Sequence, residues 1–139
     1  MVPTVTINVI GVLIAAIASF VVGMIWYSPA LFGKQWMKLM GMKESDMKNA
    51  KKEMGGMMVM TLILSAVTAF VLAHVLKYTG AATYMDAVFV AFIMWLGFYA
   101  TSLYLGVMYE KKSMEWWFIN AGHYLAGLIV MAIVLVVMG

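Results

Sequence analysis

The sequence predicts an all-α membrane protein with four transmembrane helices in one bundle. Of its 139 residues, 65% are hydrophobic and 11% are charged, whereas soluble domains are roughly 45–50% apolar and 25% charged. Four apolar stretches are each about as long as the ~20 residues that a helix needs to cross a bilayer; they cover residues 5–27, 57–76, 85–108 and 116–138. The chain 1–139 is therefore expected to form a single membrane domain.

The first two stretches carry small residues at every fourth position, which lie on one face of a helix. Lipid tails give helices no hydrophobic reason to associate, so close backbone approach along small residues is a main source of packing energy. These helix-packing stripes predict that the first two helices, or symmetry copies of them, touch closely and that the protein is a homo-oligomer. The stripes are Gly11, Ala15, Ser19 and Gly23 in the first stretch, and Thr61, Ser65, Ala69 and Ala73 in the second.

The connection 28–56 is expected to contain two short helices. After Pro29 the chain can restart as an amphipathic helix, with Lys34, Gln35 and Lys38 opposite an apolar face made of Leu31, Phe32, Trp36, Leu39 and Met40. A second helix is predicted over Glu44 to Met54, supported by a Glu44/Lys48 pair and ended by Gly55-Gly56.

The basic residues predict the orientation. All nine are lysines, and eight of them lie in 28–56 or just after the third stretch, at Lys111 and Lys112. By the positive-inside rule these two connections are cytoplasmic and both termini lie outside the cytoplasm, which fits a multi-pass protein of the bacterial inner (plasma) membrane. Aromatic residues near the ends of the stretches, including Trp26, Tyr27, Trp116 and Trp117, are interpreted as interfacial anchors. Because the charge is gathered in one segment, a nucleic-acid partner is not expected.

The third and fourth stretches each present polar residues on one helical face. Trp95, Tyr99, Ser102 and Gly106 share one spacing, and Trp116, Asn120, His123 and Gly127 share the same one. Counting ~1.5 Å of rise per residue places these polar side chains at similar depths. The candidate polar layer is Ser19, Tyr99, Ser102, Asn120 and His123. Such a layer either holds helices together or lines a route for a proton or solute, and the packing role is favoured.

A second polar group lies near the other ends of the helices. Asp86 is interpreted as a partner of a helix N-terminus and His74 as an interfacial anchor beside Phe70 and Tyr78, while Asn8 precedes the first small-residue stripe. His74 and His123 differ by ~15 Å in depth, which is too far for both to ligate one haem within a chain. No cofactor is therefore expected.

Enzyme chemistry and metal binding find little support in the sequence. The chain has no cysteine, which excludes disulfides, thiolate zinc sites and iron–sulfur clusters. It also lacks a catalytic triad or paired carboxylates, so the protein is not expected to be an enzyme. Eight of the 16 methionines lie between Met37 and Met60, where thioethers would suit a soft metal. Methionine is also flexible apolar filler, and that interpretation is preferred, so no metal site is predicted.

Three segments of the chain form a recognisable pattern, namely Gly23-Met24-Ile25-Trp26-Tyr27-Ser28-Pro29-Ala30-Leu31-Phe32-Gly33-Lys34-Gln35-Trp36-Met37, Trp95-Leu96-Gly97-Phe98 and Phe118-Ile119-Asn120-Ala121-Gly122-His123-Tyr124. Together they resemble the domain of unknown function 1761 family of small bacterial four-helix membrane proteins. The resemblance implies the four-helix membrane fold and supplies no activity.

Two functions from different classes fit these observations. The first is a homo-oligomeric protein of the lipid bilayer that binds or transports a small solute, an ion or a lipid, for which the polar layer is the evidence. The alternative is a structural or interaction module that acts through its lysine-rich amphipathic connection.

Overall fold

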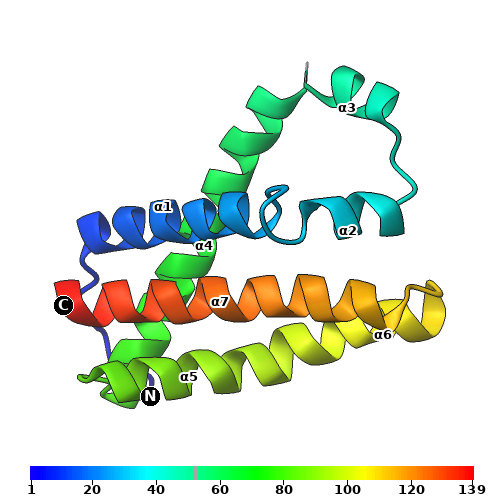
Figure 1. Cartoon of the computed structure of the whole chain (residues 1–139). Helices are drawn as coiled ribbons and strands as arrows, with labels where there is room; N and C mark the ends of the chain where they lie inside the picture. Colours follow the sequence, from blue (N-terminus) through cyan, green and yellow to red (C-terminus); the bar gives the residue numbers. More distant parts are fainter. Residues whose placement is uncertain (52) are drawn as a thin grey trace.

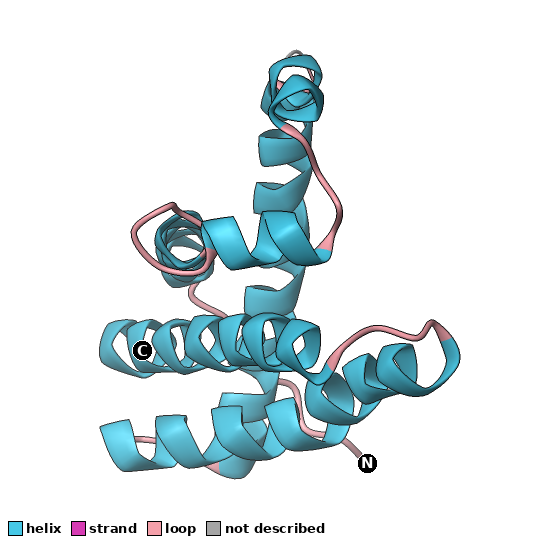
Figure 2. Cartoon of the chain, turned by 45° about the vertical axis from the view of Figure 1, so that its right-hand side comes forward, coloured by secondary structure: helices cyan, strands magenta, loops and turns pink. Residues whose placement is uncertain are grey.

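The computed structural model describes residues 1–51 and 53–139, and helices joined by loops make up this part of the chain (Figures 1 and 2). Its elements are α1 (Val9–Trp26), α2 (Gly33–Leu39), α3 (Glu44–Ala50), α4 (Met54–Thr79), α5 (Tyr84–Trp95), the π-helical segment η1 (Leu96–Ala100), α6 (Thr101–Tyr109) and α7 (Met114–Met138). No strand occurs in these residues. The side chains of Glu44, Met47 and Lys48, and all of Lys52, lie outside the description, and with them the predicted Glu44/Lys48 pair.

Four helices are long and apolar enough to cross a membrane: α1, α4, the continuous helix Tyr84–Tyr109 formed by α5, η1 and α6, and α7. The prediction of an all-α membrane protein with four transmembrane helices is confirmed. Helix α7 is central, with α1 on one side and α5 and α6 on the other, while α4 crosses this layer steeply (Figure 1). The centre is filled by fully buried alanines, which let the backbones approach closely: Ala15, Ala69, Ala87, Ala91 and Ala132.

Helix α1 begins later than the hydrophobic stretch suggests, at residue 9 instead of residue 5. The reason is Asn8, whose side chain accepts a hydrogen bond of 3.1 Å from the backbone N–H of Gly11 and so caps the helix. The same amide donates a 3.0 Å hydrogen bond to the carbonyl oxygen of Met138. Asn8 thus joins the start of α1 to the end of α7.

The prediction that Gly55-Gly56 ends a helix is wrong. Both glycines lie in the first turn of α4, which begins at Met54, and the preceding helix α3 ends at Ala50. Backbone N–H groups in the first turn have no partner inside the helix in any case, so glycine is tolerated there. The long apolar run that follows propagates the helix.

The small residues of α1 pack mainly on α7, although α1 also contacts α4. A methyl group added to Gly23 would lie 3.0 Å from Nε2 of His123, and one added to Gly127 would lie 3.0 Å from Oγ of Ser19. On α4, Ala69 and Ala73 are buried, whereas Thr61 is exposed and Ser65 is half-buried. The stripe on α4 meets the bundle only over its second half, because α4 crosses the other helices and its first half leaves them.

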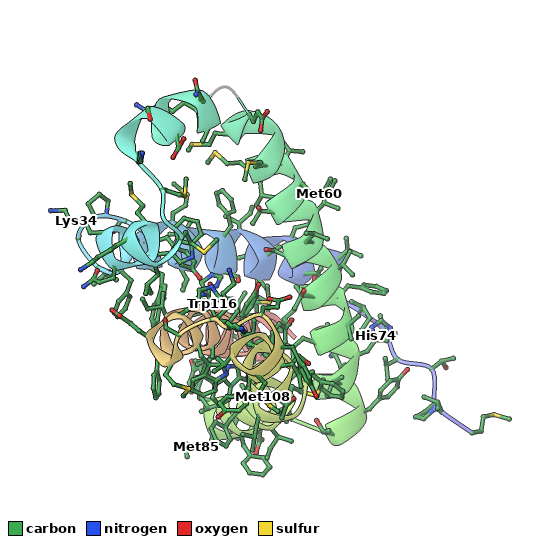
Figure 3. All side chains as sticks on the ribbon, turned by 90° about the vertical axis from the view of Figure 1, so that its right-hand side faces the viewer. Lys34, Met60, His74, Met85, Met108 and Trp116 are labelled. Carbon is green, nitrogen blue, oxygen red and sulfur yellow. The ribbon has the colours of Figure 1, made fainter. Side chains whose placement is uncertain are left out.

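The polar residues at the far end have local roles. Asp86 and Thr83 form a capping box at the start of α5, as expected of an acid at a helix N-terminus. His74 lies on the outer side of α4 (Figure 3), where its ring contacts Phe70 and Tyr78 and its Nδ1 is 2.8 Å from the Phe70 carbonyl oxygen.

Candidate functional site

Segments that are far apart in the sequence meet at one turn of α7. The indole N–H of Trp26, the last residue of α1, donates a 2.9 Å hydrogen bond to the carbonyl oxygen of Ile119. The hydroxyl of Tyr27 donates to Oδ1 of Asn120 at 2.7 Å. From the other side, the indole N–H of Trp95 donates to the carbonyl oxygen of Ala121 at 2.7 Å. Three aromatic side chains thus fix α1 and α5 to the same part of α7.

Two glycines make room for this arrangement. A methyl group on Gly122 would lie 2.9 Å from Cζ2 of Trp26, and one on Gly23 would lie 3.0 Å from Nε2 of His123. Both distances are shorter than ordinary van der Waals contact between carbon and its neighbours. The indole of Trp26 and the imidazole of His123 therefore fit between α1 and α7 because these positions have no side chain.

Five rings follow one another through the site, and we refer to them as the aromatic band. In order they are Trp36, Tyr27, His123, Tyr124 and Tyr99, with neighbouring ring centroids 5.7, 5.1, 5.1 and 4.8 Å apart. They come from α2, the end of α1, α7 and η1. The last pair is stacked, with 30° between the ring planes.

The aromatic band lines one wall of a cavity of about 900 Å³. The opposite wall is α4, which contributes Met54, Met57, Met58, Thr61, Leu64, Ser65 and Thr68. The cavity opens sideways because the first half of α4 stands off the bundle, as its exposed residues show: Met57 is 61% exposed and Leu64 is 59% exposed. No charged side chain is among the described residues that line it.

Several polar groups in this cavity have no hydrogen-bond partner among the side chains and backbone groups that the structure describes. No hydrogen bond to the protein is made there by the imidazole of His123, the hydroxyls of Tyr99 and Tyr124, or the hydroxyls of Ser19 and Ser65. By contrast, the hydroxyls of Thr61 and Thr68 donate to carbonyl oxygens of their own helix. The unpartnered groups are therefore available to a bound molecule.

The family described as Protein of unknown function (DUF1761) matches residues 10–136. The chain belongs to this family. No curated protein and no solved structure matches it. In this DUF1761 protein, the segments that carry the sequence resemblance are the ones that meet on α7, and they supply four of the five rings of the aromatic band, all but Tyr99.

The predicted polar layer of the DUF1761 chain divides into two groups. Ser19, Tyr99 and His123 line the cavity. Asn120 is held by the protein, since its Oδ1 accepts from Tyr27 and its Nδ2 donates to the carbonyl oxygen of Trp116 at 2.9 Å. The amide of Asn120 thus serves helix packing, whereas the imidazole of His123 packs against Gly23 and also lines the cavity.

Ser102 does not join the layer, and its assignment there is wrong. It is exposed and does not line the cavity. The cause is the π-helical segment η1, which places one extra residue in the helix and turns everything after it by about 100°. The carbonyl oxygen of Ala100 in η1 accepts a 3.0 Å hydrogen bond from the indole N–H of Trp117.

Residues that sequence reasoning missed in the DUF1761 site are Tyr27, Trp36 and Tyr124, together with Trp26. The sequence predicts that Trp26 and Tyr27 are interfacial anchors, but both donate hydrogen bonds to α7. The depth count places both at the end of the first stretch, about 10 Å from the level of His123, so it gives no signal of these contacts.

In the described part of the DUF1761 chain, no three His, Asp or Glu side chains lie close enough together to bind a metal ion. The methionines of the cavity wall, on α1, α4 and α7, supply polarizable apolar surface. The site is thus suited to hold a molecule by contact and by hydrogen bonds.

Proposed function

We propose that this protein is a homo-oligomeric integral membrane protein that binds a small, uncharged, amphipathic molecule taken up from the bilayer. The observation that carries the proposal is the cavity between α1, α4 and α7, in which aromatic rings and unpartnered polar groups lie beside apolar surface, with no charged side chain among the described lining residues. Pockets for small molecules are typically about 300–1,000 Å³ and are mostly apolar with a few polar groups. The cavity has this character.

Energetics favour a polar but neutral ligand. A hydroxyl buried in an apolar surrounding without a partner costs roughly 2–7 kcal/mol, so a molecule that covers Tyr99 or Tyr124 binds well only if it offers a hydrogen bond to the hydroxyl. An ion would need compensation for its charge, and the described lining offers no carboxylate or lysine. A neutral lipid-like ligand is therefore preferred over ion conduction.

The position of α4 supports access from the side. Its first half exposes apolar residues, among them Met57, Val59 and Met60, and the cavity lies between this part of α4 and α1. A molecule dissolved in the bilayer can approach the aromatic band without crossing water. The same exposed surface of α4 is available for contact with a second copy of the chain.

The amphipathic helix α2 takes part in this site. Trp36 packs against Tyr27 at the end of the aromatic band. Lys34, at the edge of the molecule in Figure 3, and Lys38 are both exposed. This geometry favours the binding proposal over a module that acts only through its lysines. Substitution of both lysines by glutamine is expected to leave ligand binding unchanged within twofold in a binding assay, whereas an interaction module would lose its function.

A tryptophan that fills the cavity tests the proposal. Ser65 lines the cavity and Val67, two residues further along α4, is 56% exposed outside it. A ligand at 100 times its Kd stabilises a protein by about 2.7 kcal/mol, so added membrane lipid extract should raise the Tm of the detergent-purified wild type and of Val67→Trp. It should not raise the Tm of Ser65→Trp. An equal rise in all three proteins would contradict the proposal.

The orientation in the membrane is part of the proposal and rests on the lysine distribution. The chain has no cysteine of its own, so single cysteines report cleanly on accessibility. We expect Thr79→Cys to react with an impermeant maleimide in intact cells, and Ser45→Cys to react only after permeabilisation. The reverse labelling pattern would overturn the assignment of the first and third connections to the cytoplasm.

A further inference from the structure

We infer that the ligand of the cavity is a membrane quinone, that is, a flat conjugated ring with two carbonyl oxygens on a polyprenyl tail. The inference rests on the proposed function and specifies the chemical class of its ligand. Three features of the cavity carry it: the aromatic band, the hydrogen-bond donors within it, and the largely apolar remainder of its described lining.

The aromatic band offers a flat ring both faces and edges of neighbouring rings, because the ring planes are tilted by 58° between Tyr27 and His123 and by 54° between His123 and Tyr124. Tyr27, His123 and Tyr124 follow one another at centroid distances of 5.1 Å, and all three line the cavity. Aromatic and conjugated rings prefer offset-stacked or edge-to-face contacts with centroids about 4.5–7 Å apart. A glycerol headgroup has no flat face that stacks on such rings.

The hydrogen-bonding groups of the band match carbonyl acceptors. A neutral imidazole has one N–H donor, and each tyrosine has one O–H donor. In the described part of the chain His123, Tyr99 and Tyr124 have no protein acceptor, although they lie in the cavity wall. A quinone brings acceptors only, so it would satisfy these donors without leaving a donor of its own unpaired.

The lack of charged groups in the described cavity lining disfavours ionic headgroups as alternative ligands. An aromatic band attracts a quaternary ammonium group, but this attraction is smaller than the cost of burying a charge without a counter-ion in hydrocarbon. The described cavity lining contains neither a carboxylate to pair with a cation nor a lysine to pair with a phosphate. A neutral headgroup is left as the best match.

The remaining wall suits a branched hydrocarbon tail. It consists largely of flexible or apolar side chains, namely Phe20, Met24, Met54, Met57, Leu64 and Met131. Methionine adapts to irregular apolar shapes through its rotatable bonds. Since the cavity opens toward the exposed half of α4, a long tail can extend from it into the bilayer.

Photoaffinity labelling tests this inference on the full chain in lipid nanodiscs. The probe is an azido-benzoquinone with a two-isoprene tail, and labelled peptides are located by mass spectrometry. We expect saturable labelling of α4 or α7 residues at the cavity. An unlabelled quinone with the same tail should compete at least tenfold more strongly than the corresponding prenyl alcohol or tetraphenylphosphonium.

Variants of the two histidines provide matched controls. His123→Phe keeps an aromatic ring but removes the donor, and it should weaken quinone competition about tenfold. His74→Phe alters the outer side of α4, away from the cavity lining, and should change it less than twofold. If His123→Phe does not fold, Tyr124→Phe removes only a hydroxyl and should weaken competition about threefold.

Each other outcome contradicts a defined part of the account. Equal competition by the quinone and the prenyl alcohol, with labelling still at the cavity, would refute the quinone class and leave lipid binding intact. Stronger competition by tetraphenylphosphonium would assign the aromatic band to a cation. No saturable labelling by any probe would refute the inference, and it would refute the proposed function as well if Ser65→Trp also failed to alter the lipid-induced rise in Tm.

Discussion

Replacement of Gly33 by alanine is expected to destabilise the protein by about 3 kcal/mol, the upper end of the usual range for overpacking. A methyl group at this position would lie 2.5 Å from the carbonyl oxygen of Tyr27 and 2.8 Å from the backbone of Ser28. These neighbours are backbone atoms and cannot rotate away. They are also fixed by hydrogen bonds from Gly33 N–H to the Ser28 oxygen at 2.9 Å and from Phe32 N–H to the Trp26 oxygen at 3.0 Å.

The measurement is the free energy of unfolding in mixed micelles as SDS is titrated in. Gly55→Ala is the matched control, because Gly55 lies in a helix and a methyl group there meets no atom within 4 Å. Helix propensity predicts that this control is neutral or more stable by up to about 1 kcal/mol. Equal stability of Gly33→Ala and the wild type would refute the tight turn between α1 and α2.

The second large effect is expected at Gly122, where alanine should cost about 2 kcal/mol by overpacking. The added methyl group would lie 2.9 Å from Cζ2 and 3.2 Å from Cη2 of Trp26. The indole cannot move freely because its N–H is bound to the carbonyl oxygen of Ile119 at 2.9 Å. The added methyl group must therefore either break the Trp26–Ile119 hydrogen bond or push α1 away from α7.

A double-mutant cycle isolates this contact, since residues that touch are energetically coupled. Trp26→Phe shortens the side chain, so Gly122→Ala should cost much less in the Trp26→Phe background. Gly97→Ala is the control within a transmembrane helix, where a methyl group meets nothing within 4 Å. If the two substitutions are additive, Trp26 does not lie against Gly122 in the membrane.

The sequence predicts the existence of the four long helices because bilayer thickness imposes their length and apolar composition. The predicted positions of the helix ends were less accurate, because a helix end depends on single hydrogen bonds such as the one by which Asn8 caps α1. The steep crossing of α4 was not foreseeable. A helix face that meets lipid and one that meets another helix are both apolar, so hydropathy alone does not orient α4.

The candidate site was predicted in part. Depth along the helices brought Ser19, Tyr99 and His123 to one level, and all three line the cavity. Ser102 was misplaced because nothing in the local sequence marks the π-helical turn at Leu96–Ala100. Tyr27 was missed because aromatic residues are also common at membrane interfaces, where no contact with α7 is needed.

Native mass spectrometry from gentle detergent tests the central claim most directly, because it reports oligomeric state and retained ligand together. The wild type and Val67→Trp should appear as oligomers that carry a neutral lipid-like molecule on each chain. Ser65→Trp should appear as the same oligomer without it. A monomeric wild type would refute self-association, and identical adducts on the wild type and Ser65→Trp would contradict binding in the cavity between α1, α4 and α7.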